Sequence, residues 1–230
     1  MKRMMIVPLG LLLLASCALA SPLCGSGGLP NTTLAAYEAN YTGFGNACLI
    51  GDKLFYNFNM SHSDGSVVPD ATDITLAGDT IAPLTNPGLV ISSGEFFLFG
   101  SKTLNVTITY SVATASGSAF LEDYNLVIAG SNGRGTGYGI VTESFDNVAP
   151  LTVSIGPGSA SNVGAHVAFS PYIVGTTVTT HIVEFGGTAS QHMDVSYIQE
   201  NFSEKLPEPY AAVLIGSGLV LLGLRRKRVA

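Results

Sequence analysis

The sequence predicts a mainly β fold: an antiparallel β-sandwich, jelly-roll-like, with one short N-terminal helix, a signal helix at the start and a membrane helix at the end. Three observations predict the sandwich. Apolar and polar residues alternate along several short segments, which is the period of a strand with one covered face. Turn signals rich in Gly, Pro, Asn and Asp separate these segments. The body of the chain has no long helical pattern and no repeat of fixed period, which argues against a solenoid.

The clearest alternation lies at 104–112, and three other segments show the same pattern over a shorter length. The apolar residues assigned to one face in each are Leu104, Val106, Ile108, Tyr110 and Val112; Leu151, Val153 and Ile155; Val174, Val178 and Ile182; and Met193, Val195 and Tyr197. The continuous apolar run at 96–99 predicts a strand covered on both sides. Turns are expected at 63–65, 86–88, 131–133 and 156–158.

Charge is distributed unevenly along the 230 residues. Only 11% of the residues are charged, and basic side chains gather at the two ends. Between 21 and 206 there are four basic and fifteen acidic side chains, a balance of −11. An acidic domain with scattered lysines repels nucleic acid and anionic lipid, so nucleic acid is excluded as a partner.

The first twenty residues have the pattern of a secretory signal peptide. A basic start is followed by an apolar stretch at 4–14 and then by small residues. Ala18 and Ala20 fit the A-x-A pattern, so we expect signal peptidase to cleave after Ala20. The alternative is lipoprotein processing, because the residues before Cys17 resemble a bacterial lipobox and would leave Cys17 as a lipidated N-terminus.

The last segment, 206–230, has three parts. The triplet Pro207, Glu208 and Pro209 precedes an uncharged stretch at 210–224, which predicts a short membrane helix of about 22 Å. Four basic residues follow this stretch and mark its cytoplasmic end; they are Arg225, Arg226, Lys227 and Arg228. The domain expected to lie outside the cytoplasm is therefore 21–205, between a signal at 1–20 and this anchor.

These three parts, in this order, resemble the PEP-CTERM sorting signal of exported bacterial proteins, a tail also called the ice-binding protein C-terminal domain. The resemblance implies recognition by an exosortase, an integral-membrane cysteine protease, with removal or transfer near the triplet. It also implies a Gram-negative bacterium that makes exopolysaccharide. The expected route is export through the inner membrane, transient anchoring there, and then the cell surface or the extracellular matrix.

Cys24 and Cys48 predict a disulfide, because Cys17 is lost with the signal peptide and these two are then the only pair in an oxidising compartment. Between them, Leu34 and Tyr37 share one face of a predicted short helix that Asn31 could cap. A strand is expected over 48–58. This cysteine-bracketed segment resembles one in many PEP-CTERM proteins, and that resemblance brings no activity with it.

Catalytic and metal-binding patterns are weak, and the sequence predicts no enzyme and no cofactor. The four histidines are His62, His166, His181 and His192, and none matches a zinc-protease motif. His192 and Asp194 share a strand face and are the only candidates for a hydrolase. A calcium site at Asp64, Asp70 and Asp73 is an alternative to an ordinary solvated surface.

The glycine-rich stretch at 130–139 predicts a hairpin, with a ligand loop using Arg134 and Tyr138 as the alternative.

The leading functional hypothesis is a structural, non-catalytic surface or matrix protein. A polysaccharide-binding module is the alternative, with Tyr138 and Tyr172 as candidate contacts. Ice binding is less favoured because its threonine array would consist only of pairs: Thr107 and Thr109, and Thr177 and Thr179.

Overall fold

The structure is a computed structural model that describes residues 21–24, 33–63, 65, 67–79, 86–116, 119–132, 135–146, 148–157 and 162–205. The predicted signal peptide and the predicted sorting tail lie outside the described residues. Among the residues that are described, no helix is both long enough and apolar enough to cross a bilayer.

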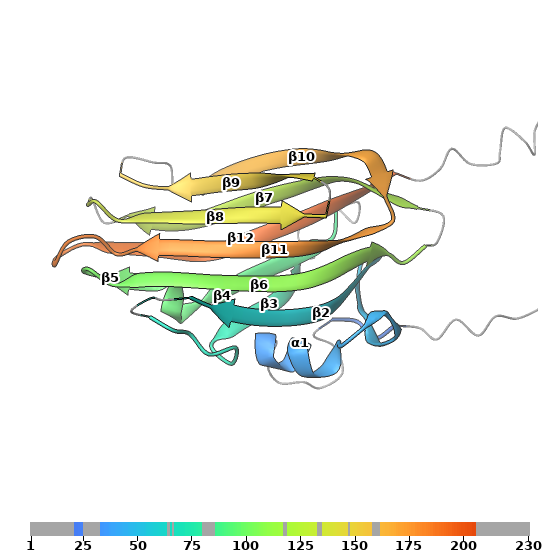
Figure 1. Cartoon of the computed structure of the whole chain (residues 1–230), viewed down its shortest axis with the longest axis horizontal. Coiled ribbons are helices and arrows are strands. Elements are labelled where there is room, and N and C mark those ends of the chain that lie inside the picture. Colours follow the sequence, from blue (N-terminus) through green and yellow to red (C-terminus); the bar gives the residue numbers. More distant parts are fainter. Residues whose placement is uncertain are drawn as a thin grey trace, which may run out of the picture.

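Two antiparallel sheets pack face to face, which confirms the predicted β-sandwich with one short helix. Sheet A contains, in spatial order, β1 (Cys48–Ile50), β2 (Lys53–His62), β6 (Thr103–Thr114), β11 (Gly175–Phe185), β8 (Tyr138–Phe145) and β9 (Val148–Ile155). Sheet B contains β10 (Asn162–Ile173), β7 (Phe120–Asn132), β12 (His192–Lys205), β4 (Gly88–Ser93) and β3 (Ile74–Asp79), with β5 (Phe97–Phe99) also pairing with β12. Figure 1 shows the two layers one behind the other, with α1 (Leu34–Asn40) beside β2.

The core lies between the sheets and follows the predicted alternation in most strands. All five apolar residues predicted on one face of 104–112 are buried, as are Val153, Ile155, Val178 and Ile182. Strands with one covered face bury every second residue, so these positions fix the register of β6, β9 and β11. Burial of these side chains stabilises the sandwich by roughly 1.5–3 kcal/mol each.

Two residues predicted to lie in the core do not. Val174 is 57% exposed, because it lies in the connection from β10 in sheet B to β11 in sheet A. Tyr197 is displaced by a β-bulge, since the pairing of β12 with β7 shifts between Val195 and Tyr197. The bulge reverses the alternation and directs Ile198 into the core instead.

The apolar run at 96–99 was predicted to be a strand covered on both sides, and this prediction is wrong. Phe96 ends a short 3-10 turn, η2 (Gly94–Phe96), and is fully buried. β5 follows with Leu98 facing the core. Phe97 and Phe99 face outward and are 52% and 53% exposed, because no described residue forms a layer over the outer face of sheet B at this point.

The N-terminal helix is short, as predicted, but it begins at a different cap. Thr33 is the N-cap, and its hydroxyl accepts the Ala36 amide at 3.4 Å. The predicted cap Asn31 lies outside the described residues, two positions before this start. Leu34 and Tyr37 are buried as predicted, and the Tyr37 ring packs edge-on against Phe58 of β2 at 4.8 Å between centroids.

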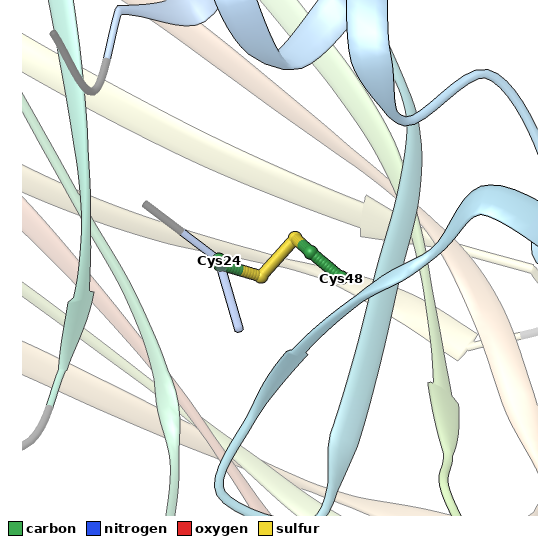
Figure 2. The surroundings of a disulfide bond; sticks show 2 residues. All are labelled: Cys24 and Cys48. Atoms are coloured by element: carbon green, nitrogen blue, oxygen red, sulfur yellow. A yellow bond between two sulfur atoms is a disulfide. The ribbon is translucent and has the colours of Figure 1, made fainter. Parts of the chain in front are cut away.

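The predicted disulfide between Cys24 and Cys48 is confirmed (Figure 2), with an S–S distance of 2.01 Å. It joins the start of the described chain to β1, where Leu49 also donates its amide to the Pro22 carbonyl at 2.8 Å. Closing a loop of 24 residues contributes about 3 kcal/mol in the chain-entropy account.

The strand predicted over 48–58 is divided into β1 and β2 by a tight turn at Gly51, whose φ of 60° is the left-handed conformation that glycine adopts readily.

The stretch at 130–139 is not a hairpin. β7 belongs to sheet B and β8 to sheet A, so the chain crosses between the layers there.

Candidate functional site

His192 and Asp194, the only hydrolase candidates in the sequence, do not contact each other in a catalytic pair. His192 and Asp194 share the outer face of sheet B, as predicted, but each has a different partner. The His192 ring stacks on Phe97 with 5.3 Å between centroids and 26° between planes. Asp194 accepts a hydrogen bond from the Ser196 hydroxyl at 2.6 Å. His181 and Glu184 lie on opposite faces of β11, as expected from strand geometry.

The residues considered for calcium serve the local turn. Asp73 accepts the Asp70 amide at 3.1 Å, and Asp70 accepts the Thr72 amide at 3.1 Å. Asp64 lies outside the described residues. Within the part of the chain that the structure describes, no three His, Cys, Asp or Glu side chains come together in a way that could hold a metal ion.

The threonine pairs are neighbours on the outer face of sheet A. Thr109 pairs with Thr179, whereas Thr107 lies opposite His181 and Thr177 lies opposite Ser111. Thr142 extends the row beyond His181 and lies 3.1 Å from the hydroxyl of Thr152. The imidazole of His181, bonded to Asn105 at 2.8 Å, interrupts the hydroxyls, so the face is not the uniform threonine array that ice binding requires.

A cluster of acids and hydroxyls lies in the middle of the core. Glu143 of β8 and Glu200 of β12 are fully buried on either side of Thr180, whose hydroxyl oxygen is 3.0 Å from the first carboxyl and 2.9 Å from the second. Tyr110 donates its hydroxyl to Glu200. Since Thr180 has only one hydroxyl proton, one of the two carboxyls must donate a proton to it.

Burial is the main cause that raises the pKa of Glu143 well above 4.5, and the neighbouring Glu200 raises it further. The pKa of Glu200 is raised by burial, against the opposing effect of its hydrogen bonds. The pair therefore keeps a shared proton to a higher pH than ordinary carboxyls do. Each side chain in the cluster is at most 1% exposed, so the cluster is closed to ligands.

A surface pocket of about 550 Å³ lies at the edge of sheet B and is the candidate functional site. We call it the β7–β10 groove. Its lining comes from one end of β7 and from the facing part of β10, and consists of Glu122, Asp123, Ala168, Phe169, Ser170, Pro171 and Tyr172.

Two irregularities in strand pairing produce the β7–β10 groove. On β10 the pairing shifts between Ala168 and Ile173, so the four residues 169–172 stand out from the ladder. On β7, Asp123 and Leu121 pair with consecutive residues of β12, so Glu122 between them has no register partner on that strand. An edge strand tolerates such a bulge, and it tolerates Pro171, which has no amide to donate, because it has a neighbour on only one side. Phe169 anchors the bulge with its buried ring packed edge-on against Phe145 at 5.5 Å.

The two carboxylate oxygens of Asp123 in the β7–β10 groove differ in their contacts. One oxygen of Asp123, Oδ2, is 3.4 Å from His166 Nε2. The other, Oδ1, is buried and has no hydrogen-bond partner among the described residues. A buried acceptor without a partner costs about 1–3 kcal/mol. A ligand can reach this carboxylate only through the rest of the side chain, which is 24% exposed.

Tyr172 supplies the aromatic surface of the groove. Its side chain is 43% exposed, and Lys205 at the end of β12 holds it by donating to the Tyr172 hydroxyl at 2.9 Å. The lysine nitrogen also lies 4.6 Å from the ring centroid. A partly exposed ring beside carboxylate acceptors in a hollow suits a ligand that has an apolar face and several hydroxyl donors.

Of the two tyrosines predicted to contact a ligand, only Tyr172 lies in the groove. Tyr138 begins β8 in sheet A and packs against Phe185, with 5.8 Å between ring centroids. Arg134 lies outside the described residues. Sequence reasoning missed Glu122 and Asp123, although these two adjacent acids interrupt the alternation that leads from Leu121 to Tyr124.

The comparisons with known proteins are limited. No family model and no curated protein matches the chain. Among solved structures, the chain is similar to the carbohydrate-binding module TmCBM61 in complex with β-1,4-galactotriose, with 10% identity, a TM-score of 0.33 and coverage of 78% of this chain and 97% of that chain.

Two further similarities are of the same kind. The enzymatically active domain of bacteriophage CBA120 tailspike protein 4 matches with 10% identity and a TM-score of 0.29, over 69% of this chain and 20% of that chain. A carbohydrate-binding module of Cellvibrio mixtus lichenase 5A, in complex with cellotriose, matches with 15% identity and a TM-score of 0.24, over 61% of this chain and 90% of that chain. At these scores the likenesses carry no argument about this chain, and the functional assignment has to come from its own geometry.

Proposed function

We propose that this chain is an exported, non-catalytic module that binds polysaccharide in the β7–β10 groove. The observation that carries the proposal is the exposed ring of Tyr172 beside the carboxylates of Glu122 and Asp123 in one hollow. A pyranose ring has an apolar face that stacks on an aromatic side chain and hydroxyls that donate to carboxylates. The groove therefore provides both kinds of contact that a sugar needs.

The charge of the domain narrows the class of polysaccharide. The balance of −11 between 21 and 206, and the two acids in the groove, repel polymers that carry uronic acids or sulfate. The proposed ligand is accordingly a neutral polysaccharide. Suitable first probes are β-1,4-galactan and hydroxyethyl cellulose, with β-1,4-galactotriose and cellotriose as their soluble fragments.

The first prediction concerns Tyr172. In native gels containing β-1,4-galactan or hydroxyethyl cellulose, we expect at least one polymer to retard the full chain and alginate to leave its mobility unchanged. Tyr172→Ala should weaken the retardation at least about tenfold, because losing one stacked ring costs on the order of 1.4 kcal/mol of binding free energy. Asp123→Asn should weaken it as well, by changing one acceptor of the groove.

Tyr138→Ala is the matched control, because Tyr138 is 39% exposed but lies in the other sheet. Its mobility should equal that of the wild type. Equal retardation of the wild type and Tyr172→Ala would remove the groove from the binding site. If neither neutral polymer retards the wild type, polysaccharide binding by this groove fails and the structural role expected from the sequence becomes the better account.

We also propose the route by which the chain reaches its place of action. Signal peptidase cleaves after Ala20, and an exosortase-type protease then recognises Pro207, Glu208 and Pro209 while 210–224 sits in the inner membrane. The product reaches the cell surface or the extracellular matrix. Support comes from the order of the sequence signals and from the Cys24–Cys48 disulfide, which forms in oxidising compartments.

The second prediction tests this route by intact mass. Protein recovered from the cell surface or medium of its native host should begin at Ser21, end near Pro207, and gain two mass units on reduction of its one disulfide. A lipid on Cys17 together with a retained Arg228 would contradict the route and would establish lipoprotein processing instead.

A further inference from the structure

An exposed aromatic face lies at the opposite end of sheet B from the β7–β10 groove. Phe97 and Phe99 are the outward residues of β5, and more than half of each side chain is exposed. Their neighbour Leu98 and the preceding Phe96 are fully buried. Two phenylalanines on one exposed strand face are costly to leave in water, which marks the face as a binding surface.

Polar groups border this face along β12. The register places Phe97 opposite Asp194 and Phe99 opposite His192. The His192 ring stacks on Phe97, and Asp194 lies beside it with the Ser196 hydroxyl 2.6 Å away. We call the set Phe97, Phe99, His192 and Asp194 the β5 platform. It combines two exposed phenylalanine rings with a carboxylate acceptor.

The backbone around the β5 platform is held by hydrogen bonds from three connections. The Gly100 amide donates to the Gln191 carbonyl at 2.9 Å, and the Gly186 amide donates to the Lys102 carbonyl at 3.0 Å. The side chain of Gln191 accepts the amides of Thr136 and Thr188 at 2.9 and 3.0 Å. The backbone that carries the platform is therefore ordered before a ligand arrives, which lowers the entropy cost of binding.

The distance between the two surfaces follows from the length of β12. His192 begins this 14-residue strand, and Lys205, which contacts Tyr172, ends it. At about 3.3 Å per residue the two ends are roughly 40 Å apart. A trisaccharide in the groove cannot reach the platform, so the two surfaces would act as separate sites.

We propose that the β5 platform is a second binding site for neutral polysaccharide, and that the two sites allow one chain to bridge two polysaccharide strands. This inference rests on the proposed function of the groove. Sugar is the occupant that the platform fits, because its rings lie next to Asp194 and the Ser196 hydroxyl, groups that bond the hydroxyls at the edge of a pyranose ring. A protein partner would find a strand of only three residues to pair with.

The test is a titration of the full chain with β-1,4-galactotriose and with cellotriose, together with the turbidity of mixtures with β-1,4-galactan and hydroxyethyl cellulose. We expect two trisaccharides per wild-type chain and cross-linked, turbid polymer. Phe97→Ala/Phe99→Ala should bind one trisaccharide, and Tyr172→Ala should also bind one. Both variants should bind polymer without cross-linking it.

The outcomes separate the two proposals. One trisaccharide per wild-type chain, abolished by Tyr172→Ala and unchanged by the double phenylalanine substitution, keeps the groove and overturns the platform. No binding of either trisaccharide overturns both. Turbidity that disappears in the double variant while stoichiometry stays at one, with wild-type dimers in sedimentation, would show that the platform binds a second copy of the chain and would also overturn the inference.

Discussion

We expect the free energy of unfolding to be largest in mild acid and to fall as the pH rises toward 9. Glu143, Glu184 and Glu200 are each fully buried, and burial raises the pKa of each above its ordinary value of 4.5. A nearby negative charge from Asp194 adds to the effect on the pKa of Glu184. The folded chain therefore holds protons that the unfolded chain has already released.

The sign follows from proton binding. Where the folded state binds more protons than the unfolded state, stability decreases as the pH increases. The contribution of these carboxyls is fully present below about pH 4.5 and is lost as the pH rises through their folded pKa values. Each carboxyl that is protonated only in the folded state makes the free energy of unfolding fall by up to about 1.4 kcal/mol per pH unit. Unfolding by urea at pH 5, 7 and 9 measures the slope.

Glu143→Gln isolates the shared proton, because glutamine keeps the shape of the side chain and is neutral at every pH. This variant should be more stable than the wild type at pH 8, and its stability should depend less on pH. The exposed residue Glu95 provides the control, since Glu95→Gln should follow the wild-type curve. A stability that rises between pH 5 and pH 8 would contradict the shared proton.

We also expect Lys53→Met to destabilise the fold by about 3–5 kcal/mol, the cost of leaving one member of a buried ion pair uncompensated. The Lys53 side chain is fully buried, and its nitrogen lies 2.5 Å from Asp52 Oδ1 and 3.1 Å from Glu204 Oε1. Glu204 is only 7% exposed, so losing the lysine leaves its carboxylate without a counter-charge. Midpoints of urea unfolding at pH 7 measure the loss.

Two companion variants decide whether the cost comes from the buried charge. Lys53→Met/Glu204→Gln removes both charges and should recover more than half of the lost stability. Asp52→Asn should cost less than about 1 kcal/mol, because Asp52 is 44% exposed and water screens its charge. If the double variant is no more stable than Lys53→Met, the loss comes from packing of the lysine stem.

Alternation predicted much of this fold from local sequence alone. The face formed by Leu104, Val106 and Ile108 could be read directly, because a strand with one covered face repeats every second residue. The acids at 143, 184 and 200 could not be assigned in this way, since a charged residue at an inward position looks like a break in the apolar pattern. The raised pKa of each comes mainly from burial, which depends on pairing between distant strands.

The sequence predicted only one part of the candidate site, because the other part depends on pairing between distant strands. Tyr172 was identified because an aromatic residue in a low-charge β protein is a plausible sugar contact. Its partners, Glu122 and Asp123, are about fifty residues away in the sequence. They become neighbours only through the β7–β10 pairing, its bulge, and the bulge between β7 and β12. No local period encodes a bulge, which also explains why Tyr197 was misplaced.

The position of β12 within its sheet determines how the domain responds to force. β12 is the last described strand, and it pairs with β7 along nearly its whole length, from Met193 to Lys205, while β4 and β5 flank its other side. A pull on the chain beyond Lys205 acts along the strand and across hydrogen bonds that run perpendicular to it. These bonds are loaded together in shear and do not unzip one after another. We therefore expect the sheet to resist a force along β12 better than a force applied across it.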